Sequence, residues 1–193
     1  MNPKTIQTKF PAELAREVAD ELMAELRPLC EPERISIAGS LRRGKAQVGD
    51  LEICYVSRIA PSRRPGDMFD SLNSLADLRL DEWLRYGVLA KRPSVDGVYT
   101  WGNLNKLAVH VKTKLPVDFF GADEAGWWRT LVIRTGPKEF NLKLIAGATA
   151  RGLKLHAYGP AFTDTTSGEV MPCHSEHEFL AMCGREWIKP EER

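Results

Sequence analysis

Residues 39–52 have the sequence GSLRRGKAQVGDLE, and this stretch decides how the rest of the chain is interpreted. It joins a glycine–serine turn, a basic cluster and two carboxylates, Asp50 and Glu52, in a pattern that predicts a strand. Turn N–H groups and arginine side chains bind phosphate oxygens, and carboxylates are the hard oxygen ligands that Mg²⁺ prefers. The stretch therefore predicts a site for phosphate chemistry.

A third carboxylate completes the predicted site. Asp50 and Glu52 lie two residues apart, so a strand places both side chains on one face. Asp118 lies in a second predicted strand, between Val117 and Phe119. Burying its charge there without water or a partner would be unfavourable. If the two strands are neighbours, the three carboxylates converge and repel one another unless cations share them. We expect Asp50, Glu52 and Asp118 to hold two Mg²⁺ or Mn²⁺ ions.

The residues before the carboxylates suit a triphosphate. Gly39-Ser40 lets a phosphate approach the backbone, and the Ser40 hydroxyl adds a hydrogen-bond donor. Arg43 follows, and a guanidinium binds phosphate oxygens in a bidentate manner. These features predict in-line attack by a hydroxyl on the α-phosphorus of a nucleoside triphosphate, with pyrophosphate as the leaving group.

Composition and charge indicate a soluble protein with a polyanionic partner. The chain has 193 residues, 43% hydrophobic and 27% charged, and no apolar run approaches the ~20 residues of a membrane span. The N-terminus has no apolar signal core, so we expect a cytoplasmic protein, and we expect a monomer. Although the net charge is only +1, residues 129–154 form a basic stretch with six Lys or Arg and a single acidic residue, Glu139.

Hydrophobic periodicity predicts an α+β protein with a mixed sheet and flanking helices, followed by a smaller α/β unit. The boundary falls near Gly121, giving units 1–121 and 122–193. Helices are expected at 11–29, 68–80 with an extension to 86, 123–134, 137–151 and 175–183. Strands are expected at 34–38, 48–56, 88–90, 98–101, 107–111, 115–120, 153–156, near 162 and at 170–171, and a loop at 58–67.

Four cysteines form no C-x-x-C pair, so reduced thiols are expected. Cys173, His174, His177 and Cys183 are zinc-type ligands, but their spacing matches no familiar site. Residues 175–178 instead predict a capping box that opens a helix, with zinc as the alternative.

Several motifs together resemble the DNA polymerase beta-like, family X polymerases. They are Gly39–Gly44, Val48–Glu52, Val117-Asp118, Thr135–Asn141, Gly152–Gly159, Glu178–Leu180 and Trp187–Arg193. The resemblance implies a nucleotidyltransferase palm over residues 1–121 and a polymerase-type thumb over 122–193. It also implies template-dependent DNA polymerase activity that fills short gaps in DNA repair, with gapped or primer–template DNA as partner.

The resemblance also assigns roles to residues. Asp50, Glu52 and Asp118 are implied to be the catalytic metal ligands, and Asp118 to help activate the primer 3′-hydroxyl. Residues implied to bind the nucleotide are Gly39, Ser40, Arg43, Gly49, Thr135, Gly136 and Asn141, the last at the base or the minor groove.

Three features depart from the family pattern. Glu52 replaces the usual aspartate and moves the carboxylate by one methylene, about 1.5 Å. Ile133-Arg134 replaces an aromatic pair against the sugar, which leaves the choice between ribose and deoxyribose open. Only 38 residues precede Gly39, too few for the lyase or fingers domains of larger members, so a minimal palm and thumb are expected.

Two alternatives stay open at this point. The same palm chemistry can act on RNA, protein or small-molecule hydroxyls, although the thumb-like residues 135–158 favour a nucleic acid. The chain can also be a binding module with an inactive relic site, although the three intact carboxylates argue against that.

Overall fold

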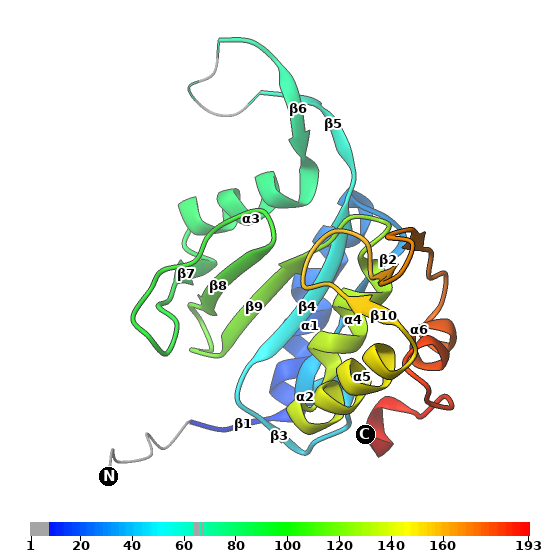
Figure 1. Ribbon diagram of the computed structural model, residues 1–193. Helices are drawn as coiled ribbons and strands as arrows, with labels where there is room; N and C mark the ends of the chain where they lie inside the picture. Colours follow the sequence, from blue (N-terminus) through cyan, green and yellow to red (C-terminus); the bar gives the residue numbers. More distant parts are fainter. Residues whose placement is uncertain (1–7, 64–65, 67) are drawn as a thin grey trace.

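The computed structural model describes residues 8–63, 66 and 68–193, and its centre is a five-stranded mixed sheet (Figure 1). The strand order is β2-β4-β9-β8-β7, in which β4 and β9 are parallel and the other neighbours are antiparallel. The strands are β2 Cys30–Ile37, β4 Leu51–Ser57, β7 Leu89–Lys91, β8 Asn105–His110 and β9 Pro116–Gly121. The predicted α+β class is confirmed.

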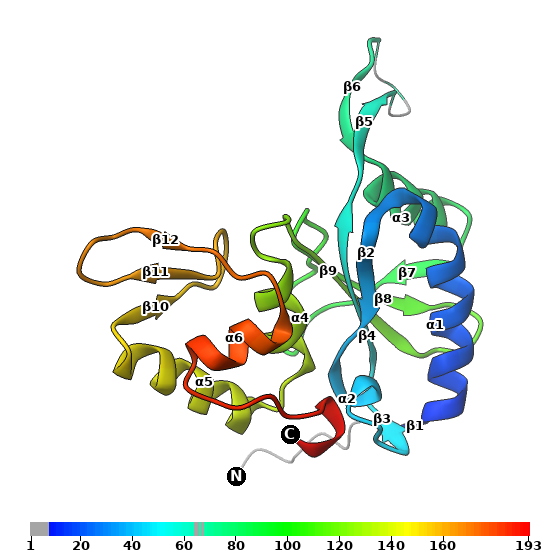
Figure 2. The same cartoon turned by 90° about the vertical axis from the view of Figure 1, so that its right-hand side faces the viewer.

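Two helices cover one face of the sheet. Helices α1 (Ala12–Leu26) and α3 (Leu75–Arg85) lie on the same side in Figure 2. The alternation along β4 turns Leu51, Ile53 and Tyr55 towards them, and all three side chains are buried in the main hydrophobic core.

Helix α4 (Trp127–Thr135) covers the opposite face. Trp127 and Leu131 of this helix pack with Cys54 of β4 and Phe120 of β9 in a second buried cluster. Glu52 and Asp118 precede Cys54 and Phe120 by two residues, so they share this face. The face that carries the carboxylates is therefore sealed by α4 at one end.

The C-terminal part is a small α/β unit. It contains α5 (Lys138–Ala150), the antiparallel strands β10 (Leu153–Leu155), β11 (Phe162–Asp164) and β12 (Val170–Met171), and α6 (Glu176–Met182). Its own core includes the buried residues Leu144, Phe162 and Phe179. Single turns of 3₁₀ helix lie at Arg27–Leu29 and Pro190–Glu192.

The predicted capping box opens α6. Ser175 Oγ accepts the Glu178 N–H at 3.0 Å, and Glu178 Oε2 accepts the His174 N–H at 2.5 Å. Within the described ranges, Cys173, His174, His177 and Cys183 form no group arranged to hold a metal ion. All four cysteines of the chain are buried free thiols.

The segment after β4 corrects the sequence prediction. Instead of a helix from residue 68, β6 (Ser71–Ser74) pairs with β5 (Ile59–Ser62) in a hairpin that projects from the body (Figures 1 and 2). Helix α3 starts only at residue 75, because Ser74 Oγ caps it by accepting the Asp77 N–H at 3.1 Å. Phe69 and Leu72, which supplied the helical pattern, are 77% and 73% exposed. Residues 64–65 and 67 of the predicted loop lie outside the described residues.

Two predicted strands also differ from the structure. The expected strand 48–56 is divided into β3 (Gln47–Val48), which pairs with β1 (Phe10–Pro11), and β4. The expected strand 98–101 is absent from this described segment, where Tyr99 and Trp101 form only isolated bridges. Both segments lie beside turns, and a turn removes the pairing partner that a continuous strand requires.

A buried charge cluster joins the sheet to α3. Lys106 Nζ on β8 lies 2.8 Å from Asp77 Oδ1, and the Tyr55 hydroxyl donates to the same oxygen at 2.6 Å. Lys106 also donates to the Gly102 carbonyl at 2.8 Å. These bonds satisfy charges that burial would otherwise make unfavourable, so they fix β8 against α3.

None of the helices in the described part of the chain has the length and apolar character to cross a bilayer.

Candidate active site

Strand pairing brings the predicted carboxylates together. β4 and β9 are parallel neighbours, and Glu52 is the direct partner of Asp118 in their register. Neighbouring strands lie about 4.8 Å apart, so the two side chains stand next to each other on one sheet face. Asp50 immediately precedes β4 and lies close enough for its charge to act on both. The sequence analysis required the two strands to be neighbours for the carboxylates to converge, and β4 and β9 are neighbours.

Burial makes these carboxylates difficult to ionise. Burial, together with the charges of Asp50 and Asp118, raises the pKa of Glu52 to about 8. Burial also raises the pKa of Asp118 to about 6 and raises the pKa of Asp50. Among the described residues, no hydrogen-bond donor or ion-pair partner contacts the Asp50 or Glu52 carboxylate. When they ionise, the Asp50 and Glu52 carboxylates therefore have no counter-charge in direct contact among the described residues.

Arg92 pairs directly with one carboxylate of the cluster, while the charges of Arg43 and Arg134 act on the cluster without a direct contact among the described residues. Arg92 Nη2, in the loop after β7, lies 2.6 and 2.8 Å from the two Asp118 carboxylate oxygens. The Arg92 charge opposes the effect of burial on the pKa of Asp118 and of Asp50. Its Nε is buried without a partner in the described structure. Sequence reasoning missed Arg92, since only the pairing of β7, β8 and β9 brings it to a carboxylate 26 residues away.

The donor set suits a divalent cation. Carboxylate oxygens are the ligands that Mg²⁺ and Mn²⁺ prefer, and two of the three carboxylates have no hydrogen-bond or ion-pair partner among the described residues. As the side chains stand, no three acidic, histidine or cysteine residues of the described chain are grouped to hold a metal ion. Asp118 is not free to join such a group, because the Arg92 guanidinium donates hydrogen bonds to both of its carboxylate oxygens. The residues fit a cation once Arg92 releases Asp118.

The glycine–serine turn is built directly against Glu52. Gly39 begins the four-residue helix α2 (Gly39–Arg42) with a φ of +63°, a conformation that favours glycine. A Cβ atom at Gly39 would overlap the Glu52 carboxylate, so only glycine lets the backbone approach it. Ser40 is partly exposed beside this turn and Gly49 is buried. The turn and the acidic cluster thus form one continuous site.

The nucleotide-binding residues predicted in the C-terminal part contact Arg43, which follows the turn. Arg43 Nη1 donates to the Thr135 carbonyl, and a Cβ built at Gly136 would lie 3.3 Å from the same nitrogen. Asn141 Nδ2 donates to the Ile133 carbonyl at 2.7 Å, while its Oδ1 is buried without a partner in the described structure. The fold therefore gathers Arg43, Thr135, Gly136 and Asn141 on one side of the turn.

An ion-pair network that the sequence did not reveal joins the same two parts. Arg42 donates to Glu176 at 2.8 and 2.9 Å and to Thr135 Oγ1 at 2.8 Å. Arg193 Nη2 lies 2.9 Å from Glu176 as well, and its side chain is fully buried. Glu176 thus couples the helix of the turn to α6 and to the last residue. No sequence signal identifies it, because its partners are 134 and 17 residues away.

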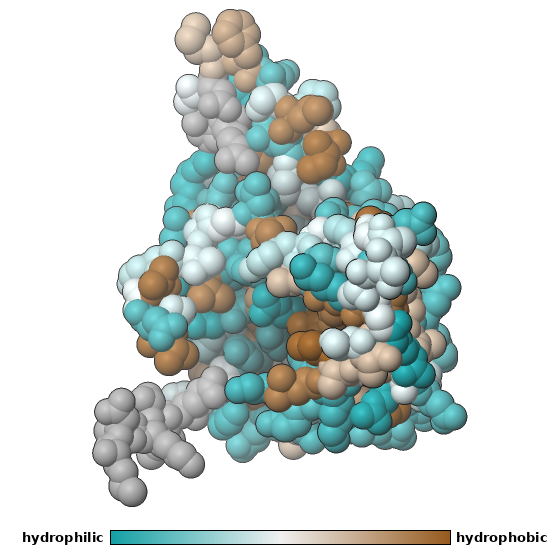
Figure 3. Space-filling model, viewed as in Figure 1, coloured by the Kyte–Doolittle hydropathy of each residue, from teal (hydrophilic) through white to brown (hydrophobic). Residues whose placement is uncertain are grey.

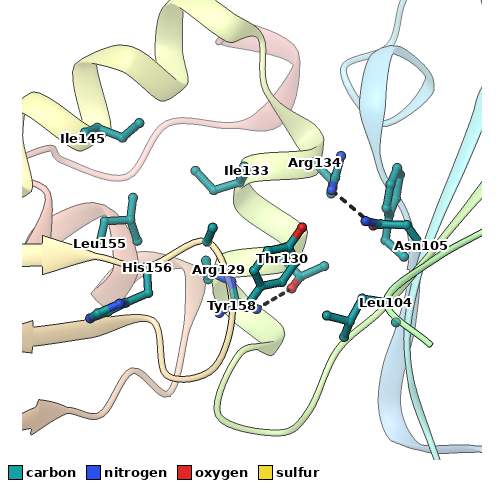
Figure 4. A pocket seen from close by; sticks show the side chains of 13 residues that line it. Leu104, Asn105, Arg129, Thr130, Ile133, Arg134, Ile145, Leu155, His156 and Tyr158 are labelled. Atoms are coloured by element: carbon teal, nitrogen blue, oxygen red, sulfur yellow. Dashed lines mark hydrogen bonds between the residues drawn. The ribbon is translucent and has the colours of Figure 1, made fainter. Parts of the chain in front are cut away.

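Arg134, which departs from the family pattern, is part of α4 and packs its side chain against the sheet. Its guanidinium is 3.7 Å from the centre of the Phe120 ring, and Nη2 donates to Asn105 Oδ1 at 3.3 Å. Phe120 follows Asp118 by two residues on the same face. Arg134 also lines a cavity further along the sheet (Figure 4).

Comparison with known proteins supports the resemblance seen in the motifs. Residues 130–193 match the family model described as DNA polymerase beta thumb. A relative in Bacillus subtilis (strain 168), named DNA polymerase/3′-5′ exonuclease PolX, is 28% identical over 186 residues. The alignment covers 96% of this chain, which spans about 28% of the length of that relative.

Proposed function

Because the chain resembles the family X DNA polymerases and ends in a polymerase beta thumb, we propose that it is a metal-dependent nucleotidyltransferase. It transfers a nucleotide from a nucleoside triphosphate to a DNA 3′-hydroxyl and releases pyrophosphate. The observation that carries this proposal is the acidic cluster, Glu52 paired with Asp118 beside Asp50, set against the Gly39 turn. A relic site has no reason to keep three carboxyl groups together where burial makes their ionisation unfavourable.

Each residue has a part in the proposed reaction. Asp50, Glu52 and Asp118 hold Mg²⁺ or Mn²⁺, which when bound supplies positive charge to the reacting oxygens. Asp118 would orient the 3′-hydroxyl and accept its proton at a carboxylate oxygen. The Gly39 turn, the Ser40 hydroxyl and the Arg43 guanidinium bind the phosphate oxygens.

The thumb and the charge of α5 favour a nucleic acid as the acceptor. Lys138 and Lys143 are exposed on α5, and the basic stretch 129–154 begins on α4 at the edge of the acidic cluster. Lys and Arg that track a phosphate backbone supply most of the affinity for DNA. We propose gapped DNA, in repair synthesis, as the physiological acceptor.

Primer extension tests the proposal. The assay uses a one-nucleotide gap with labelled primer, deoxy- or ribonucleotides, and Mg²⁺ or Mn²⁺. We expect extension by the wild type and at least a 100-fold lower rate for Asp118→Asn, because the base and a metal ligand are lost together. Asp96→Asn makes the same chemical change at an exposed position and should extend normally.

Three results would overturn parts of the proposal. Undiminished extension by Asp118→Asn would remove the metal and base assignment. Transfer of labelled nucleotide to RNA, protein or a small molecule, with none to DNA, would replace the acceptor. No triphosphate binding in Mg²⁺ or Mn²⁺ by calorimetry would leave only a binding module.

A further inference from the structure

A single row of residues across the central sheet joins Arg92 to the glycine–serine turn. Glu52 lies opposite Asp118 in the strand register, and Asp118 lies opposite Leu107 of β8. The Arg92 N–H, just after β7, donates to the Leu107 carbonyl at 3.1 Å. At the other end of the row, the Ala38 N–H donates to the Glu52 carbonyl at 2.8 Å. The row crosses four strand spacings of about 4.8 Å each, so Arg92 and the turn lie on opposite sides of the acidic cluster.

The two ends of this row suit different substrates. In the proposed function the turn binds the triphosphate, so pyrophosphate leaves at that end. In phosphoryl transfer the attacking and leaving oxygens are roughly in line, on opposite sides of the phosphorus. The acceptor hydroxyl and the strand that carries it therefore approach from the Arg92 end. Figure 3 shows that the hollow between the sheet and the C-terminal unit has hydrophilic residues along much of its sheet side, which suits a phosphate-bearing strand.

The Arg92 side chain holds Asp118 in an incomplete ion pair. A single nitrogen, Nη2, donates to both carboxylate oxygens, at 2.6 and 2.8 Å. Nη1 donates to the Pro93 carbonyl at 3.2 Å, and Nε is buried without a partner in the described structure. A guanidinium in its preferred geometry places two nitrogens against two oxygens. The pair with Asp118 therefore leaves one donor of the fork unused.

A phosphodiester supplies the acceptor that this donor lacks. Its two non-bridging oxygens can accept from Nε and Nη2 together, which pairs the buried Nε–H. A buried donor without a partner costs free energy, so the exchange favours the phosphate over Asp118 as the partner of Arg92. The last phosphodiester of a strand is attached to the same sugar that carries the reacting 3′-hydroxyl. It therefore lies near Asp118 when Asp118 contacts that hydroxyl.

We propose that Arg92 is a positioning residue that exchanges Asp118 for the last phosphodiester of the acceptor strand. The proposal rests on the proposed function for the acceptor and the cation. In the free protein Arg92 holds Asp118. In the complex it holds the strand and leaves the Asp118 oxygens to the cation and the hydroxyl. Acceptor binding and cation binding therefore strengthen each other, because each favours the state in which the Arg92–Asp118 pair is broken.

A scan of neutral linkages in the acceptor strand tests the contact without altering the protein. Fluorescence anisotropy measures binding of the full chain to a primer–template without triphosphate, at fixed ionic strength. Each phosphodiester near the 3′ end of the primer is replaced in turn by an uncharged methylphosphonate. We expect the last linkage to carry the largest loss of affinity, about 10-fold or more, as for other hydrogen bonds to charged groups.

Three variants show whether this loss comes from Arg92. Arg92→Ala should bind the intact primer and the primer with the neutral last linkage equally well, because the side chain that contacts the charge is absent. Arg92→Lys keeps the charge without the fork and should retain part of the difference. Arg79→Ala removes an arginine that forms a similar ion pair on α3, 2.8 Å from Glu25, and should retain all of it. Circular dichroism and thermal melting confirm folding. If Arg92→Ala does not fold, Arg92→Lys and the wild-type scan decide.

Two further measurements address the cation and the source of the phosphate. Mn²⁺ should tighten binding of the intact primer–template at least about 5-fold more than binding of the version with the neutral last linkage. Arg92→Ala should lose this difference. The triphosphate has the same phosphate chemistry as the strand, so calorimetry with inorganic tripolyphosphate in Mn²⁺ separates the two sources. Wild type and Arg92→Ala should bind tripolyphosphate equally, because it binds at the turn.

The outcomes are distinct. If the last linkage shows no larger loss than its neighbours, or if Arg92→Ala retains the loss, Arg92 does not hold the acceptor strand. If Arg92→Ala weakens tripolyphosphate binding while the linkage scan shows no loss, the phosphate partner of Arg92 is the triphosphate and the proposal is wrong. Normal primer extension by the wild type in either case leaves the proposed function intact. If neither DNA nor tripolyphosphate binds in Mn²⁺, both proposals are wrong.

Discussion

Replacing Glu52 by glutamine should stabilise the metal-free protein. Glutamine keeps the length of the side chain and removes a charge that has no ion-pair partner in the described structure. Burial, with the charges of Asp50 and Asp118, raises the pKa of Glu52 from 4.5 to about 8. The unfolded chain therefore releases this proton near pH 4.5 and the folded chain only near pH 8, so folding stability falls as the pH rises between these values.

The magnitude follows from the same two pKa values. Each pKa unit corresponds to about 1.4 kcal/mol, so at pH 8 the partly buried Glu52 lowers the free energy of unfolding by about 4 kcal/mol. At pH 5 most of the effect has disappeared, and about 1 kcal/mol is left. We expect Glu52→Gln to recover these amounts, which makes the variant unusual among substitutions at a proposed active site.

Urea unfolding followed by circular dichroism measures the difference. The wild type, Glu52→Gln and the exposed control Glu17→Gln are compared at pH 5 and pH 8 in EDTA, then at pH 8 with Mn²⁺. Mn²⁺ should stabilise the wild type strongly and Glu52→Gln weakly, because the cation needs the charge that the variant lacks. A variant that is less stable than the wild type in EDTA at pH 8, or a difference independent of pH, would refute the reasoning.

Three further changes test other parts of the structure. Arg92→Ala removes the guanidinium that occupies Asp118, so calorimetry should show several-fold tighter Mn²⁺ binding together with lower stability in EDTA; weaker Mn²⁺ binding would make Arg92 a structural residue only. Gly39→Ala should lose about 2 kcal/mol or more in urea unfolding, because of strain at φ +63° and overlap with the Glu52 carboxylate. The turn residue Gly168, whose φ is also positive but whose Cβ would meet no atom, is its control, and an equal loss in Gly168→Ala would exclude the overlap. Lys106→Met leaves Asp77 buried and unpaired and should lose about 3–5 kcal/mol, most of it restored by adding Asp77→Leu; no recovery in the double variant would contradict a charge effect.

Local patterns in the sequence were sufficient for the main elements. The alternation around Leu51 and around Phe119 identified β4 and β9, and the same alternation put their carboxylates on one face. The capping box at Ser175 identified the start of α6. The hairpin β5–β6 was not predicted, since Phe69 and Leu72 have helical spacing but pack against nothing that would favour a helix.

The sequence by itself determined Asp50, Glu52 and the class of chemistry they suit, because those signals lie within a few residues of one another at Gly39–Glu52, whereas Asp118 joins them through the pairing of β4 with β9. Only the tertiary structure decided what surrounds that cluster. Arg92 reaches Asp118 through three paired strands, and Glu176 joins Arg42 to the thumb across the molecule. The cavity that Arg134 lines likewise exists only where the sheet, α4 and the thumb meet. Contacts between distant residues depend on how the elements pack, and no local pattern encodes them.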